Sequence, residues 1–514
     1  MRLGASAAKM AFGLFVLVWG NLYAQENRPI TAEEDWPMYG RNLRHTFSNE
    51  HSRINPSNVS SLRLAWTFAT GDAVSASPTV VDGVVYVGSW DGYFYALDAH
   101  SGKLIWKFQV DCQNSALVLP WPPQCVPAGM VPPDRTLSDG GLITSSAAVI
   151  DNKVYFAGGK TLYSLNARNG KLRWKRVVCG NPDALNCTAD TRDPNRIFSS
   201  PAIFDGLVFV GHTVDGANGY RGGFEAIDAA TGELRWRFEI DPKMNSQGQA
   251  AGGNNRGCGG VWSSAAVDTK DRLVIFGTGD CHEDAAPPYH EAVIALESKT
   301  GQLRWVFRPR KTDTCDFDFG ASANIIDLAN SRYLGIGGKD GTYYLLDPLT
   351  RNPAGQVVWT RNVVFGGFIG GFFGGAAFDG QHIFSATGVG DVSKTGRCSS
   401  DPDPRNVFEE PSIHALNAAN GGIRWEERQN HSFGATSLSD GVVFSGLVGI
   451  PIIQPPALKA YDARSGALLH TFHMPGSVNS AATPVGKMLF VTSGNSVDGK
   501  GGGVQAFTLP QKGS

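Results

Sequence analysis

One eleven-residue unit recurs through most of the chain, and it limits the possible folds more than any other feature. At residues 226–236 it reads Ala-Ile-Asp-Ala-Ala-Thr-Gly-Glu-Leu-Arg-Trp. The other six copies lie at Ala96–Trp106, Ser164–Trp174, Ala295–Trp305, Leu345–Trp359 (with a four-residue insertion), Ala415–Trp425 and Ala460–His470. In each copy a strand ends, Asp or Asn opens a turn, Gly supplies a positive φ, and a second strand carries the final Trp or His. Each copy therefore predicts a β-hairpin.

Hairpins repeated in this way predict an all-β fold of the β-propeller type, with each copy forming the last two strands of a four-stranded blade. The repeat Trp residues are predicted to pack between blades. The segment Leu62–Phe68 resembles the closing half of a unit, whereas the last strands of the chain lack such a half. We therefore predict that Leu62–Phe68 completes the C-terminal blade, which gives eight blades in a ring without an open edge.

The N-terminus has the pattern of a secretory signal peptide. The basic residue Arg2 precedes an apolar run from Met10 to Trp19, and the small residue Ala24 follows. This apolar run is too short to span a bilayer. We expect a signal peptide at 1–25, an N-terminal extension at 26–60 and the propeller at 61–510, in an exported protein (secreted or periplasmic) with no membrane span. The net charge of −2 and the lack of a basic tract argue against nucleic acid as a partner.

Eight cysteines fit an oxidising compartment. Cys112 with Cys125 and Cys179 with Cys187 are close in sequence, and we expect each pair to form a disulfide. The pairing of the remaining four does not follow from the sequence; these are Cys258, Cys281, Cys315 and Cys398. The chain contains no Cys-x-x-Cys-His motif, so we expect no covalently attached c-type haem.

Three stretches besides the repeats resemble a known family. They are Asp35-Trp-Pro-Met-Tyr-Gly-Arg41, Gly259-Gly-Val-Trp-Ser-Ser264 and Phe373-Gly-Gly-Ala-Ala-Phe-Asp-Gly380. Together with the repeats, they are similar to the alcohol dehydrogenases that depend on pyrroloquinoline quinone (PQQ), most of all to polyvinyl-alcohol dehydrogenase and its relatives. The resemblance covers nearly all of the mature chain and implies an eight-bladed quinoprotein propeller. Some propellers of this kind are scaffolds without a cofactor, so the chemistry must be argued from the site.

Acidic residues concentrate in the stretch Asp313-Thr-Cys-Asp-Phe-Asp-Phe319, before an inner strand of the fifth blade. Carboxylates so close together are costly unless they share a cation or a proton. The resemblance makes Asp316 the catalytic base as well as a metal ligand, and Asp318 an additional metal ligand. Cys315 stands where the family usually has Trp. The alternative interpretation is a solvated acidic loop.

The resemblance implies two further metal ligands, each against the alternative of an ordinary turn Asp. Asp280 ends the stretch Phe276-Gly-Thr-Gly-Asp280, where the family often has an Asn on bound Ca²⁺, and a carboxylate there suits a hard cation. Asp215 is the only carboxylate in the third-blade segment 211–222, where the family places a Glu. With the extra carboxylate at Asp318, a lanthanide is an alternative to Ca²⁺.

The candidate cofactor-binding residues are Trp262, Lys339, Ser199 and Ser200. In the family, a Trp at the position of Trp262 forms the floor under the quinone; the alternative is ordinary packing at the channel mouth. Lys339 matches a family Lys or Arg that contacts the quinone oxygens, and the carboxylates of PQQ need cationic partners; the alternative is a turn Lys that faces water. Ser199 and Ser200 begin an inner strand of the third blade.

The residues and the resemblance together predict an exported PQQ-dependent dehydrogenase that oxidises an alcohol, with secondary and polymeric alcohols among the candidates. A bound Ca²⁺ or lanthanide would assist hydride transfer to the quinone by polarising its carbonyl. Electrons would then pass to an external acceptor such as a separate cytochrome c. The alternative is a non-catalytic propeller that binds a protein or glycan partner, and the departures from the family pattern at Cys315 and Asp215 favour it.

Overall fold

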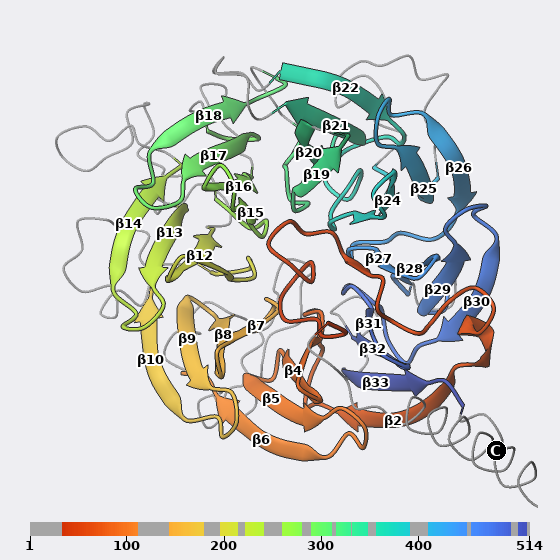
Figure 1. Cartoon of the computed structure of the whole chain (residues 1–514), viewed down its shortest axis with the longest axis horizontal. Helices are drawn as coiled ribbons and strands as arrows, with labels where there is room; N and C mark the ends of the chain where they lie inside the picture. Colours follow the sequence, from red (N-terminus) through yellow and green to blue (C-terminus); the bar gives the residue numbers. More distant parts are fainter. Residues whose placement is uncertain are drawn as a thin grey trace, which may run out of the picture.

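The computed structural model describes residues 33–111, 143–178, 196–213, 222–240, 260–279, 289–310, 315–329, 331–347, 356–390, 410–449, 454–494 and 502–510. Within these ranges the regular structure is all β, apart from one short 3-10 helix, η1 (Val59–Ser61). Eight sheets are arranged around a central axis like the blades of a propeller (Figure 1). The predicted all-β, eight-bladed fold is therefore confirmed.

The first four blades are antiparallel sheets whose strands follow one another in chain order. Blade 1 contains β3 (Thr79–Val81), β4 (Val84–Gly88), β5 (Tyr93–Asp98) and β6 (Leu104–Gln109). Blade 2 contains β7 (Ala148–Ile150), β8 (Lys153–Gly158), β9 (Thr161–Asn166) and β10 (Leu172–Val177). Blade 3 contains β11 (Ala202–Phe204), β12 (Leu207–His212), β13 (Gly223–Asp228) and β14 (Leu234–Glu239). Blade 4 contains β15 (Ala266–Asp268), β16 (Leu273–Gly277), β17 (Val293–Glu297) and β18 (Leu303–Phe307).

The next three blades repeat this order. Blade 5 contains β19 (Asn324–Leu328), β20 (Ser331–Gly337), β21 (Thr342–Asp347) and β22 (Gln356–Asn362). Blade 6 contains β23 (Ala377–Phe378), β24 (His382–Ala386), β25 (Ser412–Asn417) and β26 (Ile423–Arg428). Blade 7 contains β27 (Ser437–Ser439), β28 (Val442–Leu447), β29 (Ala457–Asp462) and β30 (Leu468–His473). The short N-terminal strand β1 (Ser48–Asn49) joins blade 7 by pairing with β27 in parallel.

The eighth blade joins the two ends of the chain. Its inner strands are β31 (Thr483–Val485), β32 (Met488–Ser493) and β33 (Gly503–Thr508), and its outer strand is β2 (Arg63–Ala69). β2 pairs antiparallel with β33, with Arg63 opposite Thr508 and Ala69 opposite Gly503. The predicted closure by an N-terminal strand is confirmed, with the strand shifted by one residue from the predicted range.

The repeat Trp side chains pack between blades, as predicted. Trp174 of blade 2 donates its Nε1–H to the carbonyl oxygen of Ala229 in blade 3, 3.1 Å away. The Trp174 ring lies on the turn glycine Gly232, where a Cβ atom would approach the ring to 2.8 Å. The same hydrogen bond to the next blade, at 2.8 to 3.0 Å, is made by Trp66 to Ala99, Trp106 to Ala167, Trp236 to Ser298, Trp359 to Ala418 and Trp425 to Ala463.

The seventh blade carries His470 at the Trp position, and the ring closure explains why. Each of these six Trp residues docks on the glycine of the turn that joins the last two strands of the following blade. In blade 8 these strands, β33 and β2, come from opposite ends of the chain, so no such turn exists to receive a Trp. The His470 ring instead lies edge-on to Phe472, with ring centroids 4.5 Å apart.

The described part of the N-terminal extension runs around the inner ends of the blades. Its backbone forms hydrogen bonds with the inner strands of six blades in chain order: Trp36 with Val80, Pro37 with Val149, Leu43 with Val267, Arg44 with Ile325, Thr46 with Phe378 and Phe47 with Leu438. The side chain of Asn49 reaches blade 8, where it donates to the carbonyl of Pro484 at 2.8 Å. Figure 1 shows this segment, in red, across the centre of the ring.

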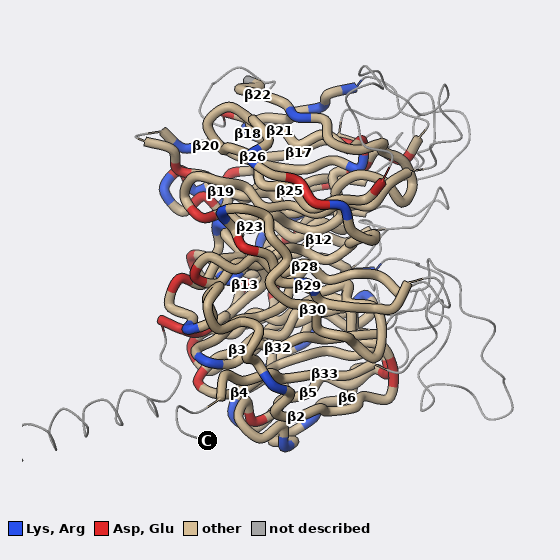
Figure 2. The backbone as a smooth tube through the Cα atoms, turned by 90° about the vertical axis from the view of Figure 1, so that its right-hand side faces the viewer, with Lys and Arg blue, Asp and Glu red and all other residues tan. Residues whose placement is uncertain are grey.

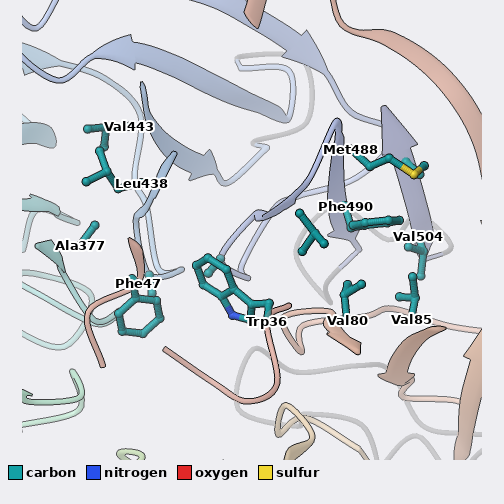
Figure 3. Close-up of a cluster of buried hydrophobic side chains, with 14 of the residues drawn as sticks. Trp36, Phe47, Val80, Val85, Ala377, Leu438, Val443, Met488, Phe490 and Val504 are labelled. Carbon is teal, nitrogen blue, oxygen red and sulfur yellow. The ribbon is translucent and has the colours of Figure 1, made fainter. Parts of the chain in front are cut away.

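Two aromatic side chains anchor this segment in the core. Trp36 and Phe47 are fully buried in one cluster that also contains Val80, Ala377 and Leu438 from three different blades (Figure 3). The extension, which the sequence analysis treated as separate from the propeller, thus contributes to the core that holds the blades together.

Basic and acidic residues are interspersed over the outside of the blades (Figure 2). No helix in the described part of the chain is long and apolar enough to cross a membrane. The predicted signal peptide at 1–25 lies outside the described residues.

Candidate functional site

Four predicted site residues meet at one place near the channel. Lys339 Nζ lies 2.7 Å from Asp316 Oδ2 and 3.9 Å from Asp318 Oδ2. Trp262 donates its Nε1–H to Asp318 Oδ2 at 2.9 Å. Lys339 and Asp318 are buried. A cation, two carboxylates and an aromatic ring, which the sequence separates by up to 77 residues, therefore form a single cluster.

Backbone contacts between blades 4 and 5 hold the acidic stretch in place. The N–H of Phe319 donates to the carbonyl of Thr278 at 3.1 Å, and the N–H of Lys339 donates to the carbonyl of Asp318 at 2.9 Å. Asp316 has a φ of 62°, a left-handed conformation that Asp tolerates better than most residues. Lys339 itself lies in the turn between β20 and β21.

The Trp262 indole is held in place by the backbone of two glycines that pack against it. It precedes β15 and is partly exposed. A Cβ atom on Gly320 would lie 1.6 Å from Trp262 Cη2, and one on Gly279 would lie 3.3 Å from its Nε1. The indole can therefore occupy this position only because residue 320 is glycine.

The electrostatics of Asp318 distinguish it from a solvated acidic residue. Burial raises its pKa from 3.8 to about 7; the Lys339 ammonium opposes this rise, and the neighbouring Asp316 carboxylate adds to it. Asp318 Oδ1 is buried and has no hydrogen-bond partner within the described residues. A buried carboxylate oxygen without a donor is an open ligand position for a cation or a proton.

Two of the four predicted metal ligands, Asp215 and Asp280, lie outside the described residues. Gly279, the residue before Asp280, lies close to Asp318, because a Cβ atom on it would be 3.5 Å from Asp318 Oδ2. The described ranges alone contain no group of three His, Cys, Asp or Glu residues that could hold a metal ion. The proposed convergence of Asp280 with Asp316 and Asp318 stays a prediction.

The two predicted serines have different surroundings. Ser199 is buried, and its hydroxyl donates to the carbonyl of Gly211 at 2.9 Å and accepts the N–H of Gly211 at 2.7 Å. Ser200 lines the channel cavity, where its Oγ accepts the N–H of Ser146 at 3.0 Å. Its own N–H donates to Ser264 Oγ at 2.9 Å. Ser200 therefore lies on the channel wall, whereas Ser199 links two strands of its own blade.

A cavity of about 230 Å³ occupies the channel beside Trp262. Its lining includes four aromatic residues for which the sequence predicted no role: Tyr39 of the N-terminal extension, Phe198, Phe373 and Phe433. The Phe373 ring lies 6.4 Å from that of Trp262 and 4.7 Å from that of Phe433, between centroids. Tyr39 and Phe373 do belong to the stretches that carry the family resemblance, which was the only signal for them.

The cysteine predictions are mostly beyond the described residues. Cys315 is buried and disulfide-bonded. The predicted pairs Cys112 with Cys125 and Cys179 with Cys187 lie outside the described ranges.

Residues 36–370 match the family described as glucose/ethanol/alcohol dehydrogenase, β-propeller domain. Residues 409–511 match the family described as outer membrane protein assembly factor BamB. Over 471 residues, 80% of this chain and 67% of the relative, the sequence is 24% identical to a polyvinylalcohol dehydrogenase of Pseudomonas sp..

A second relative is the dehydrogenase subunit of an alcohol dehydrogenase (quinone) from Gluconacetobacter polyoxogenes, 26% identical over 82% of this chain. This chain spans only 54% of that relative. The solved structure of the quinohemoprotein alcohol dehydrogenase from Comamonas testosteroni superposes with a TM-score of 0.72, covering 96% of this chain and 84% of that one. Its sequence is 19% identical, so this likeness concerns the fold.

Proposed function

The chain belongs to the family of glucose/ethanol/alcohol dehydrogenase β-propellers, and from this we propose that it is a PQQ-dependent alcohol dehydrogenase. The family match includes Trp262, Asp316, Asp318 and Lys339. The match to BamB begins at residue 409, after all four residues. It therefore concerns the propeller scaffold and gives little support to a purely structural role for the site.

The observation that carries the proposal is the buried Asp318 carboxylate, whose Oδ1 has no donor in the described part of the chain. A structural acidic residue would be expected to have its oxygens satisfied. An oxygen-seeking cation such as Ca²⁺ or a lanthanide would use this atom. We propose Asp316 and Asp318 as metal ligands, with Asp280 and Asp215 as the further ligands.

The residues around Asp318 also fit a flat anionic cofactor. Trp262 offers an indole surface held by Gly320, and Lys339 supplies a buried positive charge. When bound, PQQ would supply the two-electron oxidising chemistry that protein side chains lack. Trp262 and Lys339 are the proposed contacts, together with Ser200 on the channel wall; Ser199 would support the strand behind it.

Asp316 is the proposed base. Its Oδ2 forms the 2.7 Å ion pair with Lys339, and the ammonium stabilises the carboxylate electrostatically. In this role Asp316 would accept the proton of the substrate hydroxyl at a carboxylate oxygen, while Lys339 holds that carboxylate in position.

Export and the electron acceptor are part of the proposal. The signal-peptide pattern at 1–25 supports a secreted or periplasmic enzyme. Electrons would leave to an external acceptor, such as a separate cytochrome c. The name of the polyvinylalcohol dehydrogenase relative makes secondary and polymeric alcohols the first substrates to test.

Dye-linked alcohol oxidation tests the proposal. Protein supplied with PQQ and either Ca²⁺ or a lanthanide should reduce an artificial dye when an alcohol is added. Asp316→Asn should lower kcat by roughly 100-fold or more, as expected for loss of a general base, with an unchanged melting temperature. Asp327→Asn, which changes a partly exposed carboxylate on β19, is the control. If no combination of alcohol and metal gives dye reduction, the proposed enzymatic function is wrong, and the alternative of a non-catalytic binding scaffold is favoured.

A further inference from the structure

An unusually exposed apolar pair lies beside the proposed base. Phe368 is 69% exposed, more than any other large apolar side chain in the described ranges, and the adjacent Ile369 is 44% exposed. Most of the other exposed large apolar residues belong to outer strands such as β6 and β22. Phe368 and Ile369 instead lie between β22 and β23, in the connection that leads into the inner strand of blade 6.

Phe368 lies close to Lys339, which places it next to the candidate site. Lys339 Nζ lies 5.4 Å from the Phe368 ring centroid and also 5.4 Å from that of Phe373. The same Nζ atom forms the 2.7 Å ion pair with Asp316. A buried cation is thus flanked by two aromatic rings, one of which faces solvent.

The turn that carries the pair is held firmly by its glycines. The N–H of Gly367 donates to the carbonyl of Lys339 at 3.0 Å, and Gly371 and Gly388 exchange two backbone hydrogen bonds at 3.0 Å. Cβ atoms on Gly366 and Gly370 would each approach neighbouring backbone atoms to 2.5 Å. Backbone packs directly on backbone here, so Phe368 is exposed because the turn presents it to solvent.

We propose that Phe368 and Ile369 form the subsite for the hydrocarbon part of the alcohol, next to the carbinol that Asp316 deprotonates. This inference rests on the proposed function and specifies its substrate class. Apolar side chains at the rim gain affinity from alkyl chains and offer no hydrogen bonds to additional hydroxyl groups. The preferred substrate is therefore an alcohol on an extended apolar chain, such as a long-chain secondary alcohol, in preference to a sugar.

A chain-length series tests the subsite. With isopropanol, secondary butanol, secondary hexanol and secondary octanol, kcat/KM of the wild type should rise by up to about fourfold for each added methylene group, the factor that corresponds to burial of one CH₂. Phe368→Ala should lower kcat/KM for secondary octanol by roughly 10-fold or more and that for isopropanol by less than about threefold, and Ile369→Ala should act in the same direction. Leu104→Ala, an exposed apolar change on β6, should have no effect.

A binding measurement separates this inference from the proposed function. Calorimetric titration with secondary octanol should show binding that Phe368→Ala weakens and Leu104→Ala does not. If no alcohol is oxidised but this binding pattern is observed, the proposed enzymatic function is wrong, whereas the proposed apolar subsite is supported. If alcohols are oxidised without dependence on chain length, or if Phe368→Ala lowers kcat/KM equally for all of them, the subsite is overturned.

Discussion

Glycines in the turns of this propeller have two separable roles. Gly206 has a left-handed φ of +76°, and a Cβ atom there would meet nothing within 4 Å. Gly232 has a similar φ of +79°, but a Cβ atom there would lie 2.8 Å from the Trp174 ring. Both residues belong to turns of blade 3, so the pair distinguishes backbone strain from the loss of a contact between blades.

We predict different losses of stability for alanine at these two positions. Gly206→Ala should lower the free energy of unfolding by about 1 to 2 kcal/mol, the cost of a left-handed residue. Gly232→Ala should lower it by a further 1 to 3 kcal/mol or so, because the methyl group would displace the Trp174 ring. Denaturant midpoints of the two variants measure the difference. Equal midpoints would mean that the Trp-on-glycine contact contributes nothing to stability.

Asp318 should make the stability of the metal-free protein depend on pH. Burial raises its pKa from 3.8 to about 7, so between these values the folded protein retains a proton that the unfolded chain has released. In the metal-free protein, the contribution of Asp318 to stability should therefore fall as pH rises from about 4 to about 7, by an amount on the order of a few kcal/mol. Relative to Asp318→Asn, the wild type and Asp327→Asn should show this loss in melting temperatures measured across this pH range with a chelator present. A similar slope in Asp318→Asn would contradict the assignment.

At the scale of elements, the repeating contact joins an outer strand to the turn of the next blade. Among the described turns that are continuous in the chain, six make this contact, as between Trp425 and Ala463. It is missing at His470, because β33 and β2 are joined by pairing and not by a turn. The His in the last repeat is therefore a consequence of how the ring closes.

Substitutions at these two equivalent positions should have unequal effects. His470→Trp should change the free energy of unfolding by less than about 1 kcal/mol, because β33 and β2 are not joined by a hairpin turn of the kind that receives the other Trp rings. Trp425→His should cost about 2 to 4 kcal/mol, since it removes ring packing against Gly466 and the hydrogen bond to Ala463. Thermal unfolding of both variants tests this. A large gain for His470→Trp would reveal a docking surface on blade 8.

The hairpins could be predicted because each follows from a local pattern: a turn Asp or Asn, a glycine and a Trp. The course of residues 36–49 could not, because their hydrogen bonds join strands far away in the sequence and leave no periodic pattern. In the candidate site, the resemblance pointed to Trp262, Asp318 and Lys339, which the structure brings together. It could not identify Phe368, whose exposure depends on glycine-to-glycine packing between separate loops.

At the scale of the whole molecule, the N-terminal residues close the ring twice. β2 completes blade 8 at the periphery, and residues 36–49 bond to the inner strands of most blades at the centre. The stability of every blade should therefore depend on this one segment, which precedes all of the repeats.

Removal of residues 26–68 should abolish cooperative folding. The truncated protein would expose the edge of β33 and lose Trp36, Phe47 and Trp66 from the core, and exposed edges promote aggregation. Removal of residues 26–32 alone is the control. Size-exclusion chromatography and thermal unfolding report the outcome, and a monomer with unchanged melting behaviour would contradict the closure.

Metal-dependent retention of PQQ tests the central claim of a quinone and metal site most directly. The protein is loaded with PQQ and Ca²⁺ or a lanthanide, dialysed, and its bound quinone is measured by absorbance. The wild type and Asp327→Asn should retain close to one quinone per chain, and a chelator should release it. Asp318→Asn should retain much less, because it removes the charge of a proposed metal ligand beside Trp262 and Lys339. Retention that is independent of metal and of Asp318, or no retention in the wild type, would contradict the site proposed here.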